Sequence, residues 1–534
     1  MTWKKRGARW LRGKVRNGVV TAGKPMWIAC LLLAPAWMTS GAAPPPTPTA
    51  ADGRAAERKA ARIKLNELAA QLGEPKHERR RAAVRALAEL GTEPAWELLL
   101  GALADPRAEV ADEAQWQLGS LEHPGLSKEL FGSDGLGSRD PWVRLRVAEA
   151  LGRMPLDIDA NDLLPAGTRG DVEVSRTLLW SLERRARRDR IGEPPLGLAR
   201  KVEKLVRGNA DAALRADAFA TLAALDADAA RPYVERFSED RQARCRVAAL
   251  VMGVDLLEPD AALDLARSLV NDEDDSVRAA AVIAVEDLGV REGLELLVQR
   301  MEAEPRMRTR QRALDALQRL SGLRHRADPR PWRAWIASLP ADWRPARGEL
   351  GPTTGGTAAF AGLPLLSDRL AFLIDFSGSL WVEREGREPR KAAVDAALGA
   401  ALPKLDESAR FLLVPYTAEP HPWREDMESA KPRIVARALQ DFADCRERGS
   451  GNAYSAIELA LAQPEVDTIV LLTDGAPTGG RRWKLDLIVD LLAFELRFRP
   501  VAIDLVLVDA PSGLARRWKQ IAADSGGRAV EVSL

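Results

Sequence analysis

Four oxygen-bearing side chains follow two apolar runs in the last third of the chain. Asp375 comes directly after "LAFLI", and Ser377 and Ser379 follow it in "DFSGS". Asp474 comes directly after a second run, "TIVLLT". Carboxylates and hydroxyls are the hard oxygen ligands that Mg²⁺ prefers, with water completing an octahedral shell. Because Gly378 permits a tight curl between the serines, both hydroxyls can turn toward one ion. The pattern predicts a divalent-cation site, with Asp474 holding a coordinated water.

The elements around these residues must bring the two acids together. Between residues 367 and 534, strand-like apolar runs alternate with amphipathic helices, which predicts an α/β, doubly wound, mostly parallel sheet covered by helices on both faces. In that architecture ligands bind at the carboxyl ends of the strands, where Asp375 and Asp474 lie. We expect strands at 370–375, 410–416, 468–474, 502–509 and 528–534, and helices at 389–405, 431–445, 452–462, 483–496 and 514–524.

These motifs resemble the von Willebrand factor A (VWA) domain. Asp375-Phe-Ser377-Gly-Ser379 matches the Asp-x-Ser-x-Ser of its metal-ion-dependent adhesion site, "LLTDGAPT" matches its second acidic motif, and "GGRAVEV" fits its final turn and strand. The resemblance implies that Asp375, Ser377 and Ser379 bind Mg²⁺ or Mn²⁺, with Asp474 in the outer shell. It also implies that an Asp or Glu carboxylate of a protein partner completes the metal shell.

One loop departs from the family pattern. The third metal loop of VWA domains usually supplies a threonine hydroxyl, but "RGSGNAYSAIELAL" places Gly451 at that position. Ser450 lies one residue earlier and is the fifth candidate ligand. The departure predicts weakened metal affinity, and it leaves open a metal-independent scaffold whose site has decayed.

The first two thirds of the chain repeat an acidic or Pro turn followed by an Arg-bearing helix rich in Ala and Leu. Copies begin at 78, 105, 140, 240, 274 and 304, a spacing of about one helical hairpin in the clearest cases. "DPWVRLRVAEALG", from Asp140 to Gly152, resembles the short bacterial form of the HEAT repeat. That resemblance implies an all-α solenoid, a fold that mostly binds other macromolecules.

Charged and aromatic residues of the solenoid have structural interpretations. We expect Arg144, Arg146, Arg246 and Arg278 to pair with acids of adjacent repeats; a ligand-binding row is the alternative. The cluster "RRARRDR" at 184–190 is expected to be a solvated helix end. Three tryptophans beyond the last repeat are expected to close the exposed end of the solenoid; they are Trp332, Trp335 and Trp343.

The N-terminus indicates export. The first 24 residues contain eight Lys and Arg and no acid, and the apolar run 26–38 follows them. A basic head, a short apolar core and small residues at Ser40 and Ala42 are typical of a secretory signal, although a retained membrane anchor is the alternative. The run is too short for a comfortable membrane span. The predicted organisation is a signal peptide at 1–42, a flexible linker at 43–59, HEAT-like repeats with a cap at 60–338, a linker at 339–366 and a VWA-like domain at 367–534.

Other function classes lack support in the sequence. Without its basic head the chain is mildly acidic, which disfavours nucleic acid as a partner. Cys30, Cys245 and Cys445 form no disulfide framework, and the four histidines lack zinc-ligand spacing. The Asp-x-Asp pair of haloacid-dehalogenase-type phosphatases and the G-x-S-x-G turn of hydrolases are absent, so we expect no enzyme. The sequence therefore predicts an exported bacterial adhesion or scaffold protein in the periplasm, in the envelope or outside the cell. A Mg²⁺-dependent hydrolase that uses Asp375 is the remaining alternative.

Overall fold

A computed structural model describes residues 50–533, except for 124, 156, 168–170, 190–196, 209–210, 347–357 and 383–388. The predicted signal peptide and Cys30 lie outside the described residues. The chain divides into a unit that ends at Glu67 and a second compact unit from Leu68 to Leu534. Helix α1 (Ala50–Leu72) begins inside the segment expected to be a linker, because that segment is rich in Ala, Arg, Glu and Lys, which favour helix. No helix in the described part of the chain is long and apolar enough to cross a membrane.

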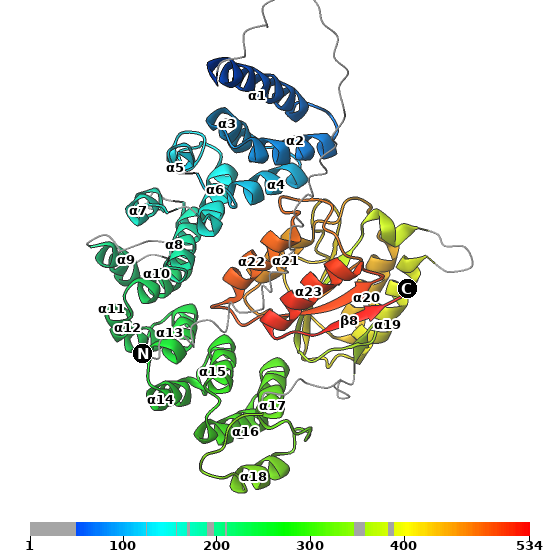
Figure 1. Cartoon of the computed structure of the whole chain (residues 1–534). Helices are drawn as coiled ribbons and strands as arrows, with labels where there is room; N and C mark the ends of the chain where they lie inside the picture. The colour runs from blue at the N-terminus through cyan, green and yellow to red at the C-terminus, as the bar shows by residue number, and fades with distance from the viewer. Residues whose placement is uncertain are drawn as a thin grey trace, which may run out of the picture. The chain divides into compact units, whose positions relative to one another are not determined.

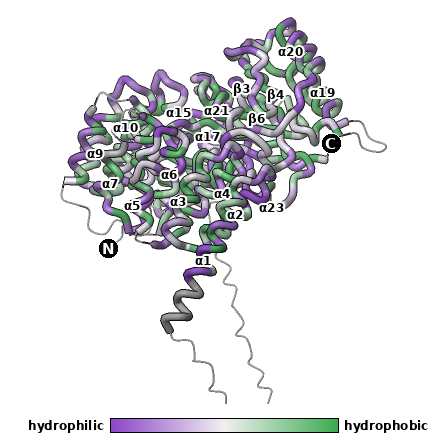
Figure 2. Tube along the Cα trace, turned by 90° about the horizontal axis from the view of Figure 1, so that it is seen from above, coloured by the Kyte–Doolittle hydropathy of each residue, from purple (hydrophilic) through white to green (hydrophobic). Residues whose placement is uncertain are grey.

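The described residues from 77 to 337 form the predicted helical solenoid (Figure 1). Hydrophilic and hydrophobic stretches alternate along its helices, as expected where each helix buries one face (Figure 2). The helices are α2 (His77–Leu90), α3 (Glu93–Ala102), α4 (Ala108–Leu118), α5 (Leu126–Phe131), α6 (Pro141–Arg153), α7 (Ala160–Gly167), α8 (Val172–Ala186), α9 (Leu198–Arg207), α10 (Ala212–Leu225), α11 (Ala227–Ala230), α12 (Pro232–Ser238), α13 (Ala243–Leu256), α14 (Pro259–Leu269), α15 (Asp275–Leu288), α16 (Leu294–Ala303), α17 (Met307–Ser321) and α18 (Pro329–Ala337).

The six predicted repeat copies coincide with α2, α4, α6, α13, α15 and α17. Two helices that self-comparison missed, α8 and α10, continue the same row, and the row packs in sequence order. Their first turns are capped by Asp171 and Asp211, whose carboxylates accept hydrogen bonds from backbone N–H groups. The eight helices are called the inner row below.

Arginines bridge adjacent repeats, as predicted. Most of these guanidinium groups pair with an acid in the connection that leads to a later helix of the chain. The distance is 2.8 Å for Arg144 with Asp171 and 2.8 Å for Arg246 with Asp272. Arg146 differs, because it pairs backward with Asp112 of α4. The forward pairs are Arg80–Asp105, Arg144–Asp171, Arg215–Asp240, Arg246–Asp272 and Arg278–Glu304.

The tryptophans beyond the last repeat form one aromatic cluster, and the first of them is buried at the end of the solenoid. Trp332 of α18 is fully buried, and its indole N–H donates to the carbonyl of Arg326 at 2.9 Å. Trp335 packs edge-on against Trp332 and against Trp343, with ring centroids 6.0 Å and 5.9 Å apart. Helix α18 packs on α16, so the buried ring of Trp332 lies at the end of the repeat array, and Trp335 and Trp343 extend this aromatic cluster.

The C-terminal domain has the predicted doubly wound, mostly parallel sheet, in the order β5-β4-β3-β6-β7-β8. Its strands are β3 (Arg369–Asp375), β4 (Arg410–Tyr416), β5 (Glu428–Ser429), β6 (Thr468–Thr473), β7 (Ala502–Val508) and β8 (Ala529–Val532). Only β5, an edge strand, runs antiparallel to its neighbour among these pairs. A small hairpin, β1 (Ala359–Phe360) with β2 (Leu363–Pro364), lies within the predicted linker and packs Phe360 against Phe372.

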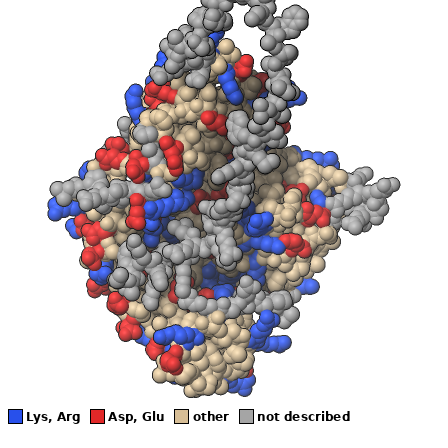
Figure 3. Space-filling model, in the orientation of Figure 1, with Lys and Arg blue, Asp and Glu red and all other residues tan. Residues whose placement is uncertain are grey.

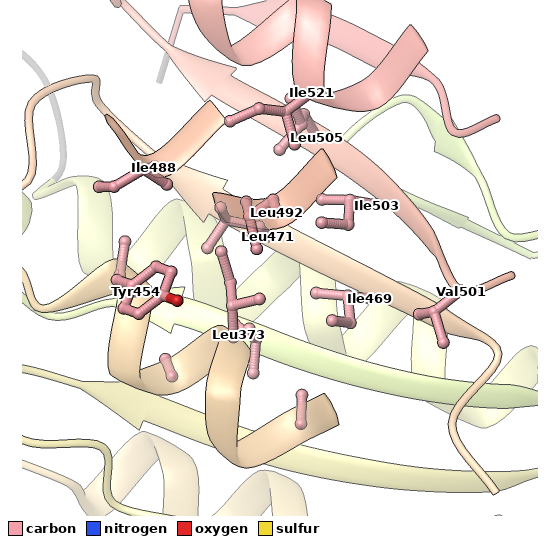
Figure 4. Close-up of a cluster of buried hydrophobic side chains, with 14 of the residues drawn as sticks. Leu373, Tyr454, Ile469, Leu471, Ile488, Leu492, Val501, Ile503, Leu505 and Ile521 are labelled. Atoms are coloured by element: carbon pink, nitrogen blue, oxygen red, sulfur yellow. The ribbon is translucent and has the colours of Figure 1, made fainter. Parts of the chain in front are cut away.

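Helices cover both faces of the sheet because successive strand residues point to opposite sides. Leu373 and its same-face neighbours pack under α21 (Ala453–Ala462), α22 (Leu485–Leu496) and α23 (Ser512–Ser525) (Figure 4). Phe372 and the opposite face pack under α19 (Arg390–Ala401) and α20 (Pro432–Asp444).

The C-terminal domain packs against the inner row of the solenoid. Trp180 of α8 stacks on Phe494 of α22, with ring centroids 4.7 Å apart. The expectation that residues 184–190 are a solvated helix end is wrong for Arg184 and Arg185, which are buried. Arg184 pairs with Asp490 of α22 at 3.1 Å, so an acid from the other domain replaces water. Further contacts reach α4, α6, α10 and α17.

Candidate functional site

Asp375 lies at the carboxyl end of β3, between β4 and β6 in the middle of the sheet. Its side chain is buried, and the residue is 5% exposed. One carboxylate oxygen accepts the N–H of Ser377 at 2.8 Å, and the other accepts the hydroxyl of Thr473 at 3.3 Å. The carboxylate is therefore held in place from two neighbouring segments.

The two serines of the predicted set lie side by side. The hydroxyl oxygens of Ser377 and Ser379 are 3.0 Å apart, so both can face one ion. The curl between them is a 3-10 turn, Gly378–Trp381. Gly378 is not among the glycines with positive φ, and a Cβ there would meet nothing within 4 Å. The curl therefore comes from the turn and does not depend on glycine at this position.

The third loop, which contains Ser450 and Gly451, places backbone atoms and no hydroxyl beside the carboxylate of Asp375. A Cβ on Gly451 would lie 3.2 Å from both carboxylate oxygens of Asp375, so this residue occupies the place beside the acid. Ser450 points toward Gly479, since its hydroxyl occupies the space that a Cβ of Gly479 would need. The structure thus places the Ser450 hydroxyl against the loop that follows Asp474.

Asp474 lies near Asp375 but has a cationic partner. Its carboxylate is 3.7 Å from one guanidinium nitrogen of Arg390, and the other terminal nitrogen of Arg390 donates to Asp509 at 2.7 Å. Arg390 therefore supplies positive charge on the outer side of the candidate site.

Asp375 is electrostatically unlike most buried acids of this protein. Asp112, Glu149, Asp217 and Asp504 all pair with arginines. Among the described residues, no Lys, Arg or His lies within ion-pair distance of Asp375. Burial, with a smaller contribution from the charge of Asp474, raises the pKa of Asp375 to about 6, although hydrogen bonds from Ser377 oppose the shift. A buried carboxylate of this kind gains most from a bound cation.

Two further side chains at the site were missed by the sequence reasoning. Thr473 precedes Asp474 in "LLTD", so its place at the strand end was readable from the sequence, and its hydroxyl bonds Asp375. Tyr416 is the residue of β4 in register with Asp375 and is fully buried. Burial and the negative charge of Asp375 raise the pKa of Tyr416 well above its usual value, so the phenol stays protonated.

The described residues contain no group of three or more His, Cys, Asp or Glu side chains that could hold a metal ion. Cys245 and Cys445 are free thiols. The candidate set at Asp375 is of another kind, with one buried carboxylate and several hydroxyls, a hard donor set that suits Mg²⁺ or Mn²⁺ rather than zinc.

No protein-family model and no curated protein matches the chain. Human deoxyhypusine hydroxylase is 18% identical and matches 49% of this chain and 97% of its own, with a TM-score of 0.22. An aerotolerance-related membrane protein from Bacteroides fragilis is 12% identical over 31% of this chain and 90% of its own, with a TM-score of 0.23. Kap121p is 13% identical over 48% of this chain and 33% of its own, with a TM-score of 0.30.

Proposed function

We propose that the chain is a protein-binding protein whose C-terminal domain captures a partner's carboxylate through Mg²⁺ or Mn²⁺. The observation that carries the proposal is Asp375, a buried carboxylate without a cationic partner among the described residues, next to paired hydroxyls. Asp375, Ser377 and Ser379 would hold the ion, with Asp474 in the outer shell, as the VWA-like motif implies. The bound ion would supply a positive charge that an Asp or Glu of the partner can reach.

The surface beside the serine loop suits a protein partner. Val382 is 55% exposed directly after the 3-10 turn. Arg448 stacks over the ring of Trp381 at 4.5 Å, and Gly449 pairs with Ser377 by a backbone bridge. Val382 and Arg448 thus place an apolar and a basic group beside the carboxyl end of β3. This combination favours a partner segment that contains an acidic residue next to an apolar one.

The proposed role of the solenoid changes with the structure. Its inner row is occupied by the C-terminal domain, so the second interaction surface of this scaffold would be the remaining helices. Acidic and basic side chains are interspersed over the face shown in Figure 3, which is consistent with a protein as the partner.

Calorimetric titration with Mg²⁺ and Mn²⁺ tests the metal site. The wild-type chain is expected to bind an ion, and Asp375→Ala is expected to abolish the heat. Asp406→Ala is the matched control, because Asp406 is an exposed acid that precedes β4 at the opposite edge of the sheet. Metal binding that persists in Asp375→Ala, or its absence in the wild type, would refute the proposal.

Partner capture tests the biological part of the proposal. Retention of an envelope protein in Mg²⁺, its release by chelator and its loss in Asp375→Ala are the expected results. We also propose that the chain is exported. N-terminal sequencing of the protein isolated from cells should then show a mature chain that begins after Ala42. A mature chain that still begins at Met1 would show that the segment is retained.

A metal-independent scaffold is the second candidate, and Gly451 favours it. Gly451→Thr discriminates, because the new side chain starts 3.2 Å from both oxygens of Asp375, close enough for its hydroxyl to join the site after a small shift. A gain of Mg²⁺ affinity in Gly451→Thr over a wild type that binds none would favour the decayed scaffold. Unchanged affinity over a wild type that already binds would favour the working site.

A further inference from the structure

The segment from Asp474 to Lys484 joins the candidate site to the solenoid; it is called the bridging loop below. At the site end it is tied to the third loop in both directions. The N–H of Gly451 donates to the hydroxyl of Thr478 at 2.7 Å, and the N–H of Thr478 donates to the carbonyl of Gly451 at 3.0 Å. Thr478 therefore helps to hold Gly451 beside Asp375, together with the hydrogen bond from the N–H of Asn452 to the carbonyl of Thr417.

At its other end the bridging loop is anchored in the solenoid by Arg482, which is 1% exposed. Arg482 forms a two-pronged ion pair with Glu149 of α6, with one contact at 3.1 Å. It also donates to the side-chain oxygen of Gln115 of α4 at 2.9 Å. A guanidinium held by planar, paired contacts fixes the orientation of the backbone that carries it.

The solenoid also caps helix α22. The residue before this helix, Lys484, provides no side-chain cap of its own. Instead, a carboxylate oxygen of Asp112 in α4 accepts the N–H groups of Trp483 at 2.5 Å and Lys484 at 2.8 Å. An acid at this place satisfies orphan N–H groups and complements the helix dipole. The N–H groups of the two residues that precede α22 are thus satisfied by a different domain.

The anchor is balanced in charge. Asp112 and Glu149 face Arg146 and Arg482, and all four side chains are buried. Arg146 pairs with Asp112 and donates to the carbonyl of Arg481 in the bridging loop at 2.6 Å. Because every charge has a partner, the network holds the loop in a single arrangement.

We infer that Asp112 and Glu149 of the solenoid are positioning residues of the candidate metal site, since they fix the bridging loop that holds Gly451 and Asp474 in place. The inference rests on the proposed function for its metal-binding part. The metal affinity of the C-terminal domain then depends on its contact with α4 and α6. By thermodynamic linkage, a partner that loosens this contact lowers metal affinity, and bound metal tightens the contact by the same factor.

Full-length Glu149→Gln tests the inference with two measurements. The first is amide hydrogen exchange of residues 474–484 without metal, and the second is calorimetric Mg²⁺ affinity. We expect faster exchange in the bridging loop and a loss of Mg²⁺ affinity of up to about tenfold, the size of effect that coupling through a packed network can have. Asp112→Asn, which keeps an oxygen for the cap, should give the same pattern more weakly and serves if Glu149→Gln does not fold.

Asp315→Asn is the matched control. Asp315 of α17 forms an equally close interdomain pair with Arg528, at 2.8 Å, but far along the solenoid from the bridging loop. It should leave loop exchange and Mg²⁺ affinity unchanged. Unaltered exchange in Glu149→Gln overturns the inference, and so does faster exchange with unaltered affinity. If the wild type binds no metal, the proposed function fails, and the exchange measurement alone decides whether the solenoid positions the loop.

Discussion

The ion pair between Arg482 and Glu149 allows a sharp test of how the two domains are joined. Both side chains are 1% exposed, and Gln115 completes the contacts of the guanidinium. Removing one partner leaves a buried charge without compensation, which costs about 3–5 kcal/mol, whereas replacing both by apolar residues of similar volume is often neutral. Arg482→Met and Glu149→Leu should each cost that much, and the double variant should cost about 2 kcal/mol or less.

The assay is urea unfolding followed by circular dichroism and, independently, by tryptophan fluorescence, so that coincident transitions justify a single free energy of unfolding. The interaction free energy between Arg482 and Glu149, obtained from the single and double variants, should change little with salt, because salt screens buried pairs poorly. The exposed pair Arg333–Glu295 is the control, with side chains 42% and 41% exposed. Arg333→Met should cost about 1 kcal/mol or less. Additive costs for Arg482→Met and Glu149→Leu would refute the argument that the two charges compensate each other.

Three further predictions concern the cores and buried charges. Burial raises the pKa of Asp467 to about 6, so its ionisation opposes folding as pH rises through that value. Asp467→Asn should therefore reduce the stability lost between about pH 4 and pH 7 by up to about 3 kcal/mol; identical pH profiles in thermal melts would contradict this. Trp332→Ala should cost about 3–5 kcal/mol in urea, because it opens the end of the solenoid; a cost below about 1 kcal/mol would show that the cap is dispensable. Gly152→Ala should lower Tm because its Cβ would lie 2.7 Å from the hydroxyl of Ser181, whereas Gly399→Ala, with nothing within 4 Å, should raise it; equal shifts would exclude the steric explanation.

The local pattern of the sequence predicted most of the fold. Acid-capped, Arg-bearing helices are visible one repeat at a time, and apolar runs that end in acid mark the sheet edge. Helices α8 and α10 were missed by the self-comparison, although Asp171 and Asp211 cap them like the other copies.

The docking of the domains could not be predicted in the same way. The sequence predicts that Arg184 and Arg185 face solvent, because charged side chains on helices usually do. Their burial depends on partners hundreds of residues away, such as Asp490 for Arg184. No local pattern contains that information. For the same reason the sequence did not predict the contacts of the bridging loop with the solenoid, such as those of Asp112 with the N–H groups of Trp483 and Lys484.

The candidate site was predicted in its residue types and only partly in its geometry. The sequence placed Asp375, Ser377 and Ser379 in one loop, which the structure keeps together. It treated Ser450 as a substitute ligand, but side-chain direction within a loop depends on packing against Gly479 and cannot be read from spacing.

The C-terminal domain holds two distant parts of the solenoid at the same time. It bonds to α4 through Asp112 and to α17 through Asp315 and Arg308. An ordinary solenoid is elastic, because each repeat touches only its neighbours and the array stretches like a spring. Here the C-terminal domain links α4, the second helix of the inner row, to α17, the last. When the ends of the solenoid are pulled apart, the force should first show one large rupture, as the C-terminal domain detaches from α4 or α17. The repeats should then unfold in smaller steps.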